Sequence, residues 1–408
     1  MMDIKKRPLI HNPQCFDRDT LLQRQESLKF KNLARMELFL WDLEIFLQIQ
    51  ENLKDKVVLK GGAAAQFYIP VDWQRTSVDI DMVCTAREED IERALASIER
   101  RLGGKGSFFR ARPHKPKDPK VQLPILTYYM DVPSVCTEKE LFSKNREGLQ
   151  EIKIEFHLVD EPLTILKVSS PSLFAAETDN TYQILPLDVL VGDKLTTLGP
   201  NTIGIPRERE DEQIKQIYDI DLLIRFHWTN LAFPQVKDAF ERRANAEKHH
   251  RGLSLTLADI YGDMIAQVKN LAIADFESDD HLQKLINDFQ SLYIKKESNR
   301  PLSEWAIVGA KIDFLLDCMS QNKDAKGCLE GLFRCEKELT FSDVAGEEKG
   351  KRIRKFREEF SADFERYSPY PAKLLKGKRP ERILWAVATP ANASEITSWV
   401  MEYVGKKS

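Results

Sequence analysis

The sequence predicts an α+β protein, in which a mixed β-sheet flanked by helices is followed by a helical C-terminal region. Three observations support this class. The segments with strand-like patterns, either short apolar runs or strict alternation, all lie between residues 57 and 159. Amphipathic helical patterns precede and separate them. From about residue 230 onward, apolar residues recur at spacings of three and four, which is typical of helices.

The length and composition are those of a globular protein with more than one domain. The 408 residues, of which 42% are hydrophobic, suffice for two or three packed domains. We expect an N-terminal arm over residues 1–30, a sheet-containing domain over 31–200 and an α-helical domain over 201–408. The net charge of −3 means that any nucleic acid must be bound by local basic patches rather than by the whole surface.

The sequence disfavours two classes of protein, namely membrane or secreted proteins and zinc-binding proteins. The sequence has no run of about 18 apolar residues, and its N-terminus lacks the apolar core of a signal peptide. We therefore expect no membrane association and a cytoplasmic location. The six cysteines form no Cys-x-x-Cys pair and have no histidines clustered near them, so we expect reduced, mostly buried thiols rather than zinc ligands.

The first strand-like segment leads into a pair of glycines. It follows a predicted helix over 33–52, and its apolar run of residues 57–59 stops before Gly61 and Gly62. Residues 63–67 then have good helix-forming character. Glycines between a strand and a helix let the backbone approach a ligand closely, and the free N–H groups at the helix start attract a phosphate.

Two acidic residues follow in an alternating segment. Polar and apolar residues alternate over residues 77–83, so a strand there would place Asp79 and Asp81 on one face and Ile80 on the other. Two carboxylates about 7 Å apart along a strand are natural oxygen ligands for Mg²⁺. Because the glycine turn and the acidic pair occur together, the region indicates a metal-dependent phosphoryl-transfer site.

The next elements are a helix, a basic loop and two strands. A helix is predicted over 88–102 and strands over 123–130 and 151–159, which we expect to pair. The segment over 105–120 is predicted to be a basic, proline-rich loop or irregular hairpin, and it is either an ordinary basic surface feature or a guide for nucleotide or RNA phosphates. Its basic residues are Lys105, Arg110, Arg112, Lys115, Lys117 and Lys120.

The second of these strands carries a further acid. Alternation would place Lys153, Glu155 and His157 on its polar face. Glu155 would then either join Asp79 and Asp81 as a third carboxylate or be an exposed acid on an edge strand.

A lysine interrupts the apolar stripe of the next helix. The helix is predicted over 187–198, and Lys194 falls in the middle of its apolar face. A lysine in such a position must either extend to solvent or meet an anion.

Taken together, these motifs resemble those of a known family. The chain is similar to the nucleotidyltransferase toxins of the AbiEii type, including the tRNA-modifying toxins of the MenT group, in the DNA polymerase β-like superfamily. Their pattern is a Gly-Gly-Ser/Thr turn followed by Arg-x-Ser-x-Asp-x-Asp. The matching residues here are Gly61, Gly62, Arg75, Ser77, Asp79 and Asp81. The chain departs from the pattern at Ala63, which removes one potential phosphate contact.

The resemblance implies a role for each of these residues. Asp79 and Asp81 would hold Mg²⁺, with two ions expected, and Glu155 would be a third ligand or a base for the attacking hydroxyl. Gly61, Gly62, Arg75 and Ser77 would bind the nucleotide. The family's Lys-Leu-x-x-Leu segment matches Lys194, Leu195 and Leu198, which implies that Lys194 contacts the triphosphate.

A further acid is implied in the helix predicted after residue 206. The family carries an Arg/Lys-Asp-x-x-Asp pattern there, in which Lys215 and Asp219 are kept while Gln216 replaces the first acid. The resemblance favours Asp219 as the functional acid, on the polar side of the helix with Lys215. Periodicity alone would favour Asp221, which falls on the apolar stripe.

The C-terminal half is expected to be helical. Helices are predicted over 235–249, 256–274, 279–293, 302–319, 325–339 and 395–404, in a domain that would either embrace the substrate or dock a partner. Residues 349–382 hold 12 Lys or Arg residues against 5 acids, interleaved with aromatic residues. They would either bind RNA with stacked bases or bury their phenylalanines, spaced four apart, as a helix face.

The function predicted from residues and resemblance is that of a nucleotidyltransferase. It would move a nucleoside monophosphate from an NTP to an acceptor hydroxyl, and the resemblance, which covers residues 57–225, implies the 3′ end of tRNA as acceptor. It also implies a toxin with an antitoxin or a role in phage defence. The alternatives are a nucleotidyltransferase for proteins or small molecules, and a nucleotide-binding protein whose site has decayed.

Overall fold

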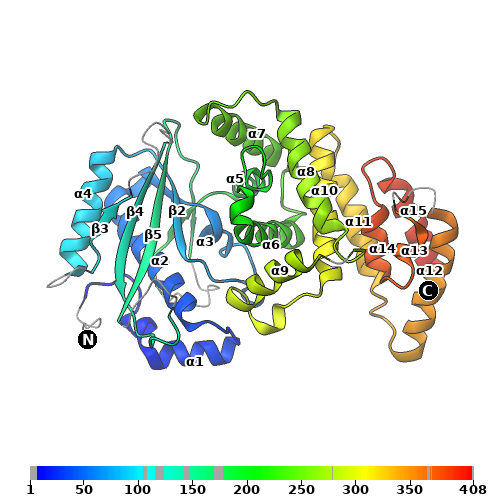
Figure 1. Cartoon of the computed structure of the whole chain (residues 1–408), viewed down its shortest axis with the longest axis horizontal. Coiled ribbons are helices and arrows are strands. Elements are labelled where there is room, and N and C mark those ends of the chain that lie inside the picture. The colour runs from blue at the N-terminus through cyan, green and yellow to red at the C-terminus, as the bar shows by residue number, and fades with distance from the viewer. Residues whose placement is uncertain are drawn as a thin grey trace. The chain divides into compact units, whose positions relative to one another are not determined.

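The computed structural model describes residues 7–103, 108–114, 124–141, 148–169, 178–277, 279–364, 368 and 370–406. The chain forms two compact units (Figure 1). The first consists of Met1–Lys194, Ala246–Leu253 and Ile286–Asn299. The second consists of Leu195–Asn245, Ser254–Leu285 and Arg300–Ser408. The first unit is thus discontinuous in sequence.

The first unit contains a seven-stranded mixed sheet with the order β3-β4-β5-β2-β1-β7-β6. The β2–β5 and β1–β7 pairs are parallel, and the other neighbours are antiparallel. The strands are β1 Val57–Leu59, β2 Asp79–Cys84, β3 Ala111–Pro113, β4 Ile125–Pro133, β5 Leu149–Leu158, β6 Leu166–Val168 and β7 Tyr182–Ile184. The predicted mixed sheet and the predicted pairing of the strands now seen as β4 and β5 are confirmed.

Helix α2, Leu33–Leu53, is the central helix of this unit. It starts where the Asn32 side chain accepts a hydrogen bond from the Arg35 N–H at 3.0 Å, and it packs against β1, β2, β5 and α4. It is buried along nearly its whole length, which also buries four polar side chains. These are Glu37, Asp42, Glu44 and Gln48.

The N-terminal segment is fastened to α2. The His11 ring lies between two buried partners, with Nδ1 at 2.6 Å from Glu44 Oε2 and Nε2 at 2.6 Å from the Tyr182 hydroxyl. The following α1, Arg18–Leu28, also packs on α2. The region that the sequence indicates as an arm therefore contains a helix and lies against the core of the unit.

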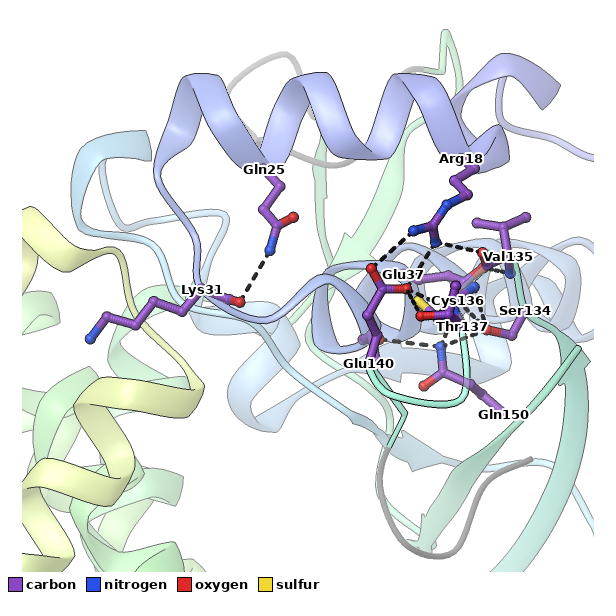
Figure 2. Close-up of polar contacts among 11 residues, drawn as sticks. Arg18, Gln25, Lys31, Glu37, Ser134, Val135, Cys136, Thr137, Glu140 and Gln150 are labelled. Carbon is purple, nitrogen blue, oxygen red and sulfur yellow. Dashed lines mark hydrogen bonds and ion pairs between the residues drawn. The ribbon is translucent and has the colours of Figure 1, made fainter. Parts of the chain in front are cut away.

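Figure 2 shows how α2 also holds the chain next to β4 and β5. The Glu37 carboxylate accepts hydrogen bonds from the Ser134 hydroxyl at 2.6 Å, the Val135 N–H at 2.7 Å and the Gln150 amide at 2.6 Å. Arg18 of α1 forms a two-pronged ion pair with Glu140, at 2.9 and 3.0 Å. Burial raises the pKa of Glu37, although these hydrogen bonds oppose the rise.

The remaining helices of the first 195 residues are short. They are α3 Gly61–Ala65, α4 Glu88–Ile98 with a π-helical turn Glu99–Gly103, and α5 Leu187–Leu195. Of the predicted basic loop, residues 108–114 are described, and Lys105, Lys115, Lys117 and Lys120 lie outside the described residues. Arg112, on β3, pairs with Asp131 and Glu151.

The chain after residue 195 is helical, as predicted. Its helices are α6 Glu210–His227, α7 Phe233–His250, α8 Leu257–Ala272, α9 Asp280–Leu292, α10 Leu302–Ser320, α11 Ala325–Leu339, α12 Gly346–Phe364, α13 Ala372–Leu375, α14 Pro380–Val387 and α15 Ala393–Gly405. The α+β class is therefore confirmed. The domain limits at residues 30 and 200 remain predictions.

The basic aromatic segment at 349–382 uses its described phenylalanines for packing. Phe356 and Phe360 of α12 are buried, and their rings lie against Trp399. They are not available for base stacking. The interpretation as a buried helix face is the correct one for these two residues, and the side chains of Phe364 and Tyr367 lie outside the described part of the chain.

Two further expectations concern the whole chain. All six cysteines are free, and five of them are buried. No helix within the described ranges is long and apolar enough to cross a membrane.

Candidate active site

The glycine turn lies directly against Asp81. Strand β1 ends at Leu59, and the Lys60 N–H donates to the Asp81 carbonyl at 2.8 Å. Gly61 has a φ of +68°, which L side chains rarely adopt. A Cβ atom at Gly61 would lie only 2.4 Å from Asp81 Oδ2. The turn therefore requires glycine for two reasons, its conformation and the carboxylate beside it.

The second glycine lies against two other predicted nucleotide-binding residues. A Cβ at Gly62 would be 2.5 Å from Arg75 Nη2 and 3.2 Å from the Ser77 hydroxyl oxygen. Gln66, which the sequence interpretation missed, links the two segments. Its amide donates to the Gly62 carbonyl, and its oxygen accepts from the Arg75 N–H, both at 2.9 Å.

The predicted carboxylates meet across two parallel strands. In the register of β2 and β5, Asp81 is opposite Glu155 and Asp79 is opposite Lys153. Along β2 the buried Ile80 and Met82 alternate with half-buried Asp79 and Asp81. Burial and the neighbouring charges of Glu155 and Asp79 raise the pKa of Asp81 to about 7, while Lys60 and Lys153 oppose the rise.

Glu155 is held by two partners of its own. Its Oε1 accepts a hydrogen bond from the Thr127 hydroxyl at 3.1 Å, and its Oε2 pairs with Lys153 Nζ at 2.9 Å. Burial works against the charge of Lys153, but Glu155, Asp79 and Asp81 outweigh it and raise the pKa of Lys153. Sequence reasoning assigned Lys153 no role, because its place opposite Asp79 depends on the pairing of β2 with β5.

Two further lysines are buried near the glycine turn. Lys60 pairs with Asp193 at 3.2 Å, and its side chain is only 8% exposed. Lys194, next along α5, is 1% exposed, so it does not extend to solvent. The alternative in which Lys194 extends to solvent is therefore excluded, and contact of Lys194 with an anionic ligand stays a prediction.

The chain matches one protein family over most of the sheet-containing region and the first helices after it. The model of the family described as nucleotidyl transferase AbiEii toxin, type IV TA system, matches residues 45–309. The chain belongs to the AbiEii nucleotidyltransferase toxin family. The resemblance predicted from the sequence is confirmed, and with it the nucleotidyltransferase activity. A type IV system implies an NTP substrate and an antitoxin partner for this AbiEii toxin.

The other two comparisons give remote likenesses or none. JHP933 from Helicobacter pylori shares 16% identity over 70% of this chain and 93% of its own, with a TM-score of 0.37. MenT4, a nucleotidyltransferase toxin from Mycobacterium tuberculosis H37Rv, shares 13% identity over 75% of this chain and 91% of its own, with a TM-score of 0.45. No curated protein matches the AbiEii chain.

The second unit holds the acid that the family pattern favours. Asp219 of α6 is fully buried, although helical projection placed it on the polar side. The competing Asp221 pairs with Arg300 at 2.7 Å and Arg225 at 3.1 Å, and despite burial these cations lower its pKa to about 2. Asp221 therefore has an evident structural role, and the functional role of Asp219 stays a prediction.

Two residues of α2 belong to the electrostatic surroundings of this AbiEii site. The Arg35 guanidinium lies 3.9 Å from the centre of the Tyr293 ring. Burial lowers the pKa of Arg35, and the charges of Tyr293 and Asp79 oppose this decrease. Asp42 is buried, and neither of its carboxylate oxygens has a hydrogen-bond partner among the described residues. Burial, then Asp79 and Asp81, raise the pKa of Asp42 well above its usual range. Neither residue stood out in the sequence, because each lies in a helix that reads as core.

The donor set fits a hard divalent cation. Asp79 and Asp81 present carboxylate oxygens from one face of β2, and such oxygens are the ligands that Mg²⁺ prefers. Burial and the charges of Glu155 and Asp79 disfavour the ionised form of Asp81, as its raised pKa indicates, and a bound cation would oppose these effects. Within the described ranges, no group of three or more His, Cys, Asp or Glu side chains is arranged to hold a metal ion. Glu155 as a third metal ligand stays a prediction.

Proposed function

We propose that this AbiEii toxin uses Mg²⁺ to transfer a nucleoside monophosphate from an NTP to a hydroxyl at the 3′ end of a tRNA, with release of pyrophosphate. The observation that carries the proposal is the close approach of Gly61 to Asp81 and of Gly62 to Arg75 and Ser77. It places the glycine turn beside a cation, a hydroxyl and a carboxylate that we take to bind the metal.

Each residue has a distinct task in this proposal. Asp79 and Asp81 hold the metal, which supplies charge neutralisation at the transferred phosphoryl group when bound. Gly61 and Gly62 let the turn lie close to Asp81, Arg75 and Ser77, and Arg75 and Ser77 donate to the triphosphate oxygens. Lys194 contributes positive charge from α5.

The charges in the first unit support a polyanionic acceptor. This unit contains Arg75 and Lys194. It also contains Arg35, which interacts electrostatically with Asp79, and Lys60 and Lys153, which interact electrostatically with Asp81. Such a group of cations favours phosphate-rich substrates. We assign the reaction to the cytoplasm, where tRNA and NTP meet, and to a toxin for phage defence held in check by its antitoxin.

The test is label transfer from each of the four α-labelled NTPs, with total tRNA and Mg²⁺, by the purified full chain. We expect label in RNA from the wild type, with losses of about a hundredfold or more in Asp79→Asn and Lys194→Met. Lys167→Met is the matched control, because Lys167 is an exposed lysine paired with Asp55 at 3.5 Å on β6. It should transfer label like the wild type.

Three results would overturn the proposal in different ways. Label that enters protein or a small molecule but not RNA would move the acceptor to those classes. Label in RNA that persists in Asp79→Asn would remove the carboxylates from the chemistry. Full activity in the presence of a chelator would exclude the metal.

A further inference from the structure

Lys153 occupies a position that an ordinary surface lysine would not. It lies on the polar face of β5, directly opposite Asp79 on β2, and its neighbour Glu155 lies opposite Asp81. Its side chain is 26% exposed and its Nζ is 2.9 Å from Glu155 Oε2. Asp79 and Asp81 of β2 therefore lie beside the ammonium group of Lys153 and the carboxylate of Glu155 on β5.

The partners of Glu155 account for both of its oxygens. One accepts from Thr127 on β4 and the other pairs with Lys153. Each oxygen keeps a second lone pair, but a metal ion on Glu155 would have to share an oxygen with the Thr127 hydroxyl or lie beside the Lys153 ammonium group. Asp81 lies against the glycine turn, and Asp79 lies on the same face of β2.

We propose that the Lys153 ammonium takes the place of one of the two metal ions expected at this site, so that the enzyme holds a single divalent cation on Asp79 and Asp81. Lys153 then acts as a built-in positive charge, kept in position by Glu155. Thr127 in turn orients Glu155. The inference rests on the proposed function, because it concerns the same metal site.

The charges agree with this arrangement. Asp79, Asp81 and Glu155 carry three negative charges when ionised, and Lys153 offsets one of them. The two that remain match one divalent cation. A second cation bound at Glu155 would also be repelled by the ammonium group of Lys153, which is paired with that carboxylate.

The test counts bound metal ions without turnover. Mn²⁺ binding to the full chain is measured by electron paramagnetic resonance and calorimetry, with and without an NTP analogue that has a methylene group between its α and β phosphorus atoms. We expect one Mn²⁺ per wild-type chain, also with the analogue. In Lys153→Met the repulsion is lost and Glu155 is released, so we expect two.

A charge-balanced double variant makes the test specific. Lys153→Met/Glu155→Gln removes the ion pair as a whole, so it should return to one Mn²⁺ with an affinity within about threefold of the wild type, because Asp79 and Asp81 are untouched. Lys167→Met is again the control and should bind one ion. Circular dichroism melting of every variant shows whether the fold is kept.

The outcomes separate failure of this inference from failure of the proposed function. Two Mn²⁺ in the wild type, one Mn²⁺ in a folded Lys153→Met, or loss of binding in the double variant would each overturn the role of Lys153. No Mn²⁺ binding by the wild type, with or without the analogue, would instead remove the metal site on which both rest.

Discussion

At the scale of single residues, Gly61 is the position where the site tolerates no change. It combines a φ of +68° with a Cβ position 2.4 Å from Asp81 Oδ2. We predict that Gly61→Ala lowers NMP transfer by roughly a hundredfold, because displacement of a metal-binding carboxylate by about 1 Å costs that much. The measurement is label transfer together with Mn²⁺ affinity.

Gly252 provides a control that separates strain from collision. Its φ is +63°, but a Cβ there would meet no atom of the described chain within 4 Å. Gly252→Ala should therefore cost about 1 kcal/mol of stability and leave transfer intact. Equal loss of transfer in both variants would show that the fold, rather than the contact with Asp81, responds to the change.

Asp42 is a buried carboxyl group with no hydrogen-bond partner among the described residues. Its raised folded-state pKa means that the folded protein keeps the proton that the unfolded chain releases. The associated stability is fully present below the ordinary Asp pKa and is lost, by about 1.4 kcal/mol per pH unit, as the pH rises toward the folded-state value.

We predict that Asp42→Asn removes this loss, so that the variant is more stable than the wild type at pH 7.5 and close to it at pH 4.5. Urea unfolding at both pH values is the measurement. Asp160→Asn, at an exposed position, should show no such difference. A variant less stable than the wild type at pH 7.5 would contradict the prediction.

Much of the site at this scale could be predicted from the sequence. Gly61, Gly62, Asp79 and Asp81 were found because turn chemistry and alternation are local properties. Gln66 and Lys153 were missed, since their contacts depend on which segments the fold brings together. No local pattern separates Lys153 from any other lysine on the polar face of a strand.

At the scale of elements, Glu37 ties α2 to the ends of β4 and β5 (Figure 2). Glu37→Ala would leave the Ser134 hydroxyl, the Val135 N–H and the Gln150 amide without their acceptor. We predict a loss of about 3 kcal/mol in the free energy of unfolding, from buried donors left unsatisfied. Denaturant unfolding measures it.

The exposed Glu51, also on α2, is the matched control. It pairs with Arg101 and its side chain is 46% exposed, so Glu51→Ala should cost less than about 1 kcal/mol. If both variants lost the same free energy of unfolding, the buried hydrogen bonds of Glu37 would contribute no more to stability than the exposed ion pair of Glu51.

The elements differed in how well sequence reasoning found them. The long helices of the C-terminal half were predicted closely because their periodicity extends over many residues. Strands β6 and β7 were not predicted, because each has three residues and β7 owes its place to pairing with β1, more than 120 residues earlier. The aromatic spacing in 349–382 left two interpretations, and packing against Trp399 decides between them for Phe356 and Phe360.

At the scale of the whole molecule, the first unit requires a segment from far along the chain. Residues 286–299 belong to it, and several contacts with earlier parts of the chain hold them there. The Tyr293 carbonyl accepts from the Thr76 N–H at 3.0 Å, the Ser298 hydroxyl donates to the Asp72 carbonyl at 3.0 Å, and Lys295 pairs with Phe30 in a β-bridge.

We predict that a fragment of residues 1–200 is less stable than the full chain and does not bind Mn²⁺ normally. Addition of a peptide of residues 286–299 should raise its melting temperature, and a scrambled peptide should not. A fragment that melts like the full chain and is unaffected by the peptide would show that the segment is dispensable.

This discontinuity has a consequence for the synthesis of the toxin. Thr76, which the late segment holds, lies between Arg75 and Ser77 of the nucleotide site. Domains fold as the ribosome delivers them, N-terminal parts first. We therefore expect the segment around Thr76 to reach its final form only after residue 299 has left the ribosome, and a prematurely terminated chain to lack NMP transfer.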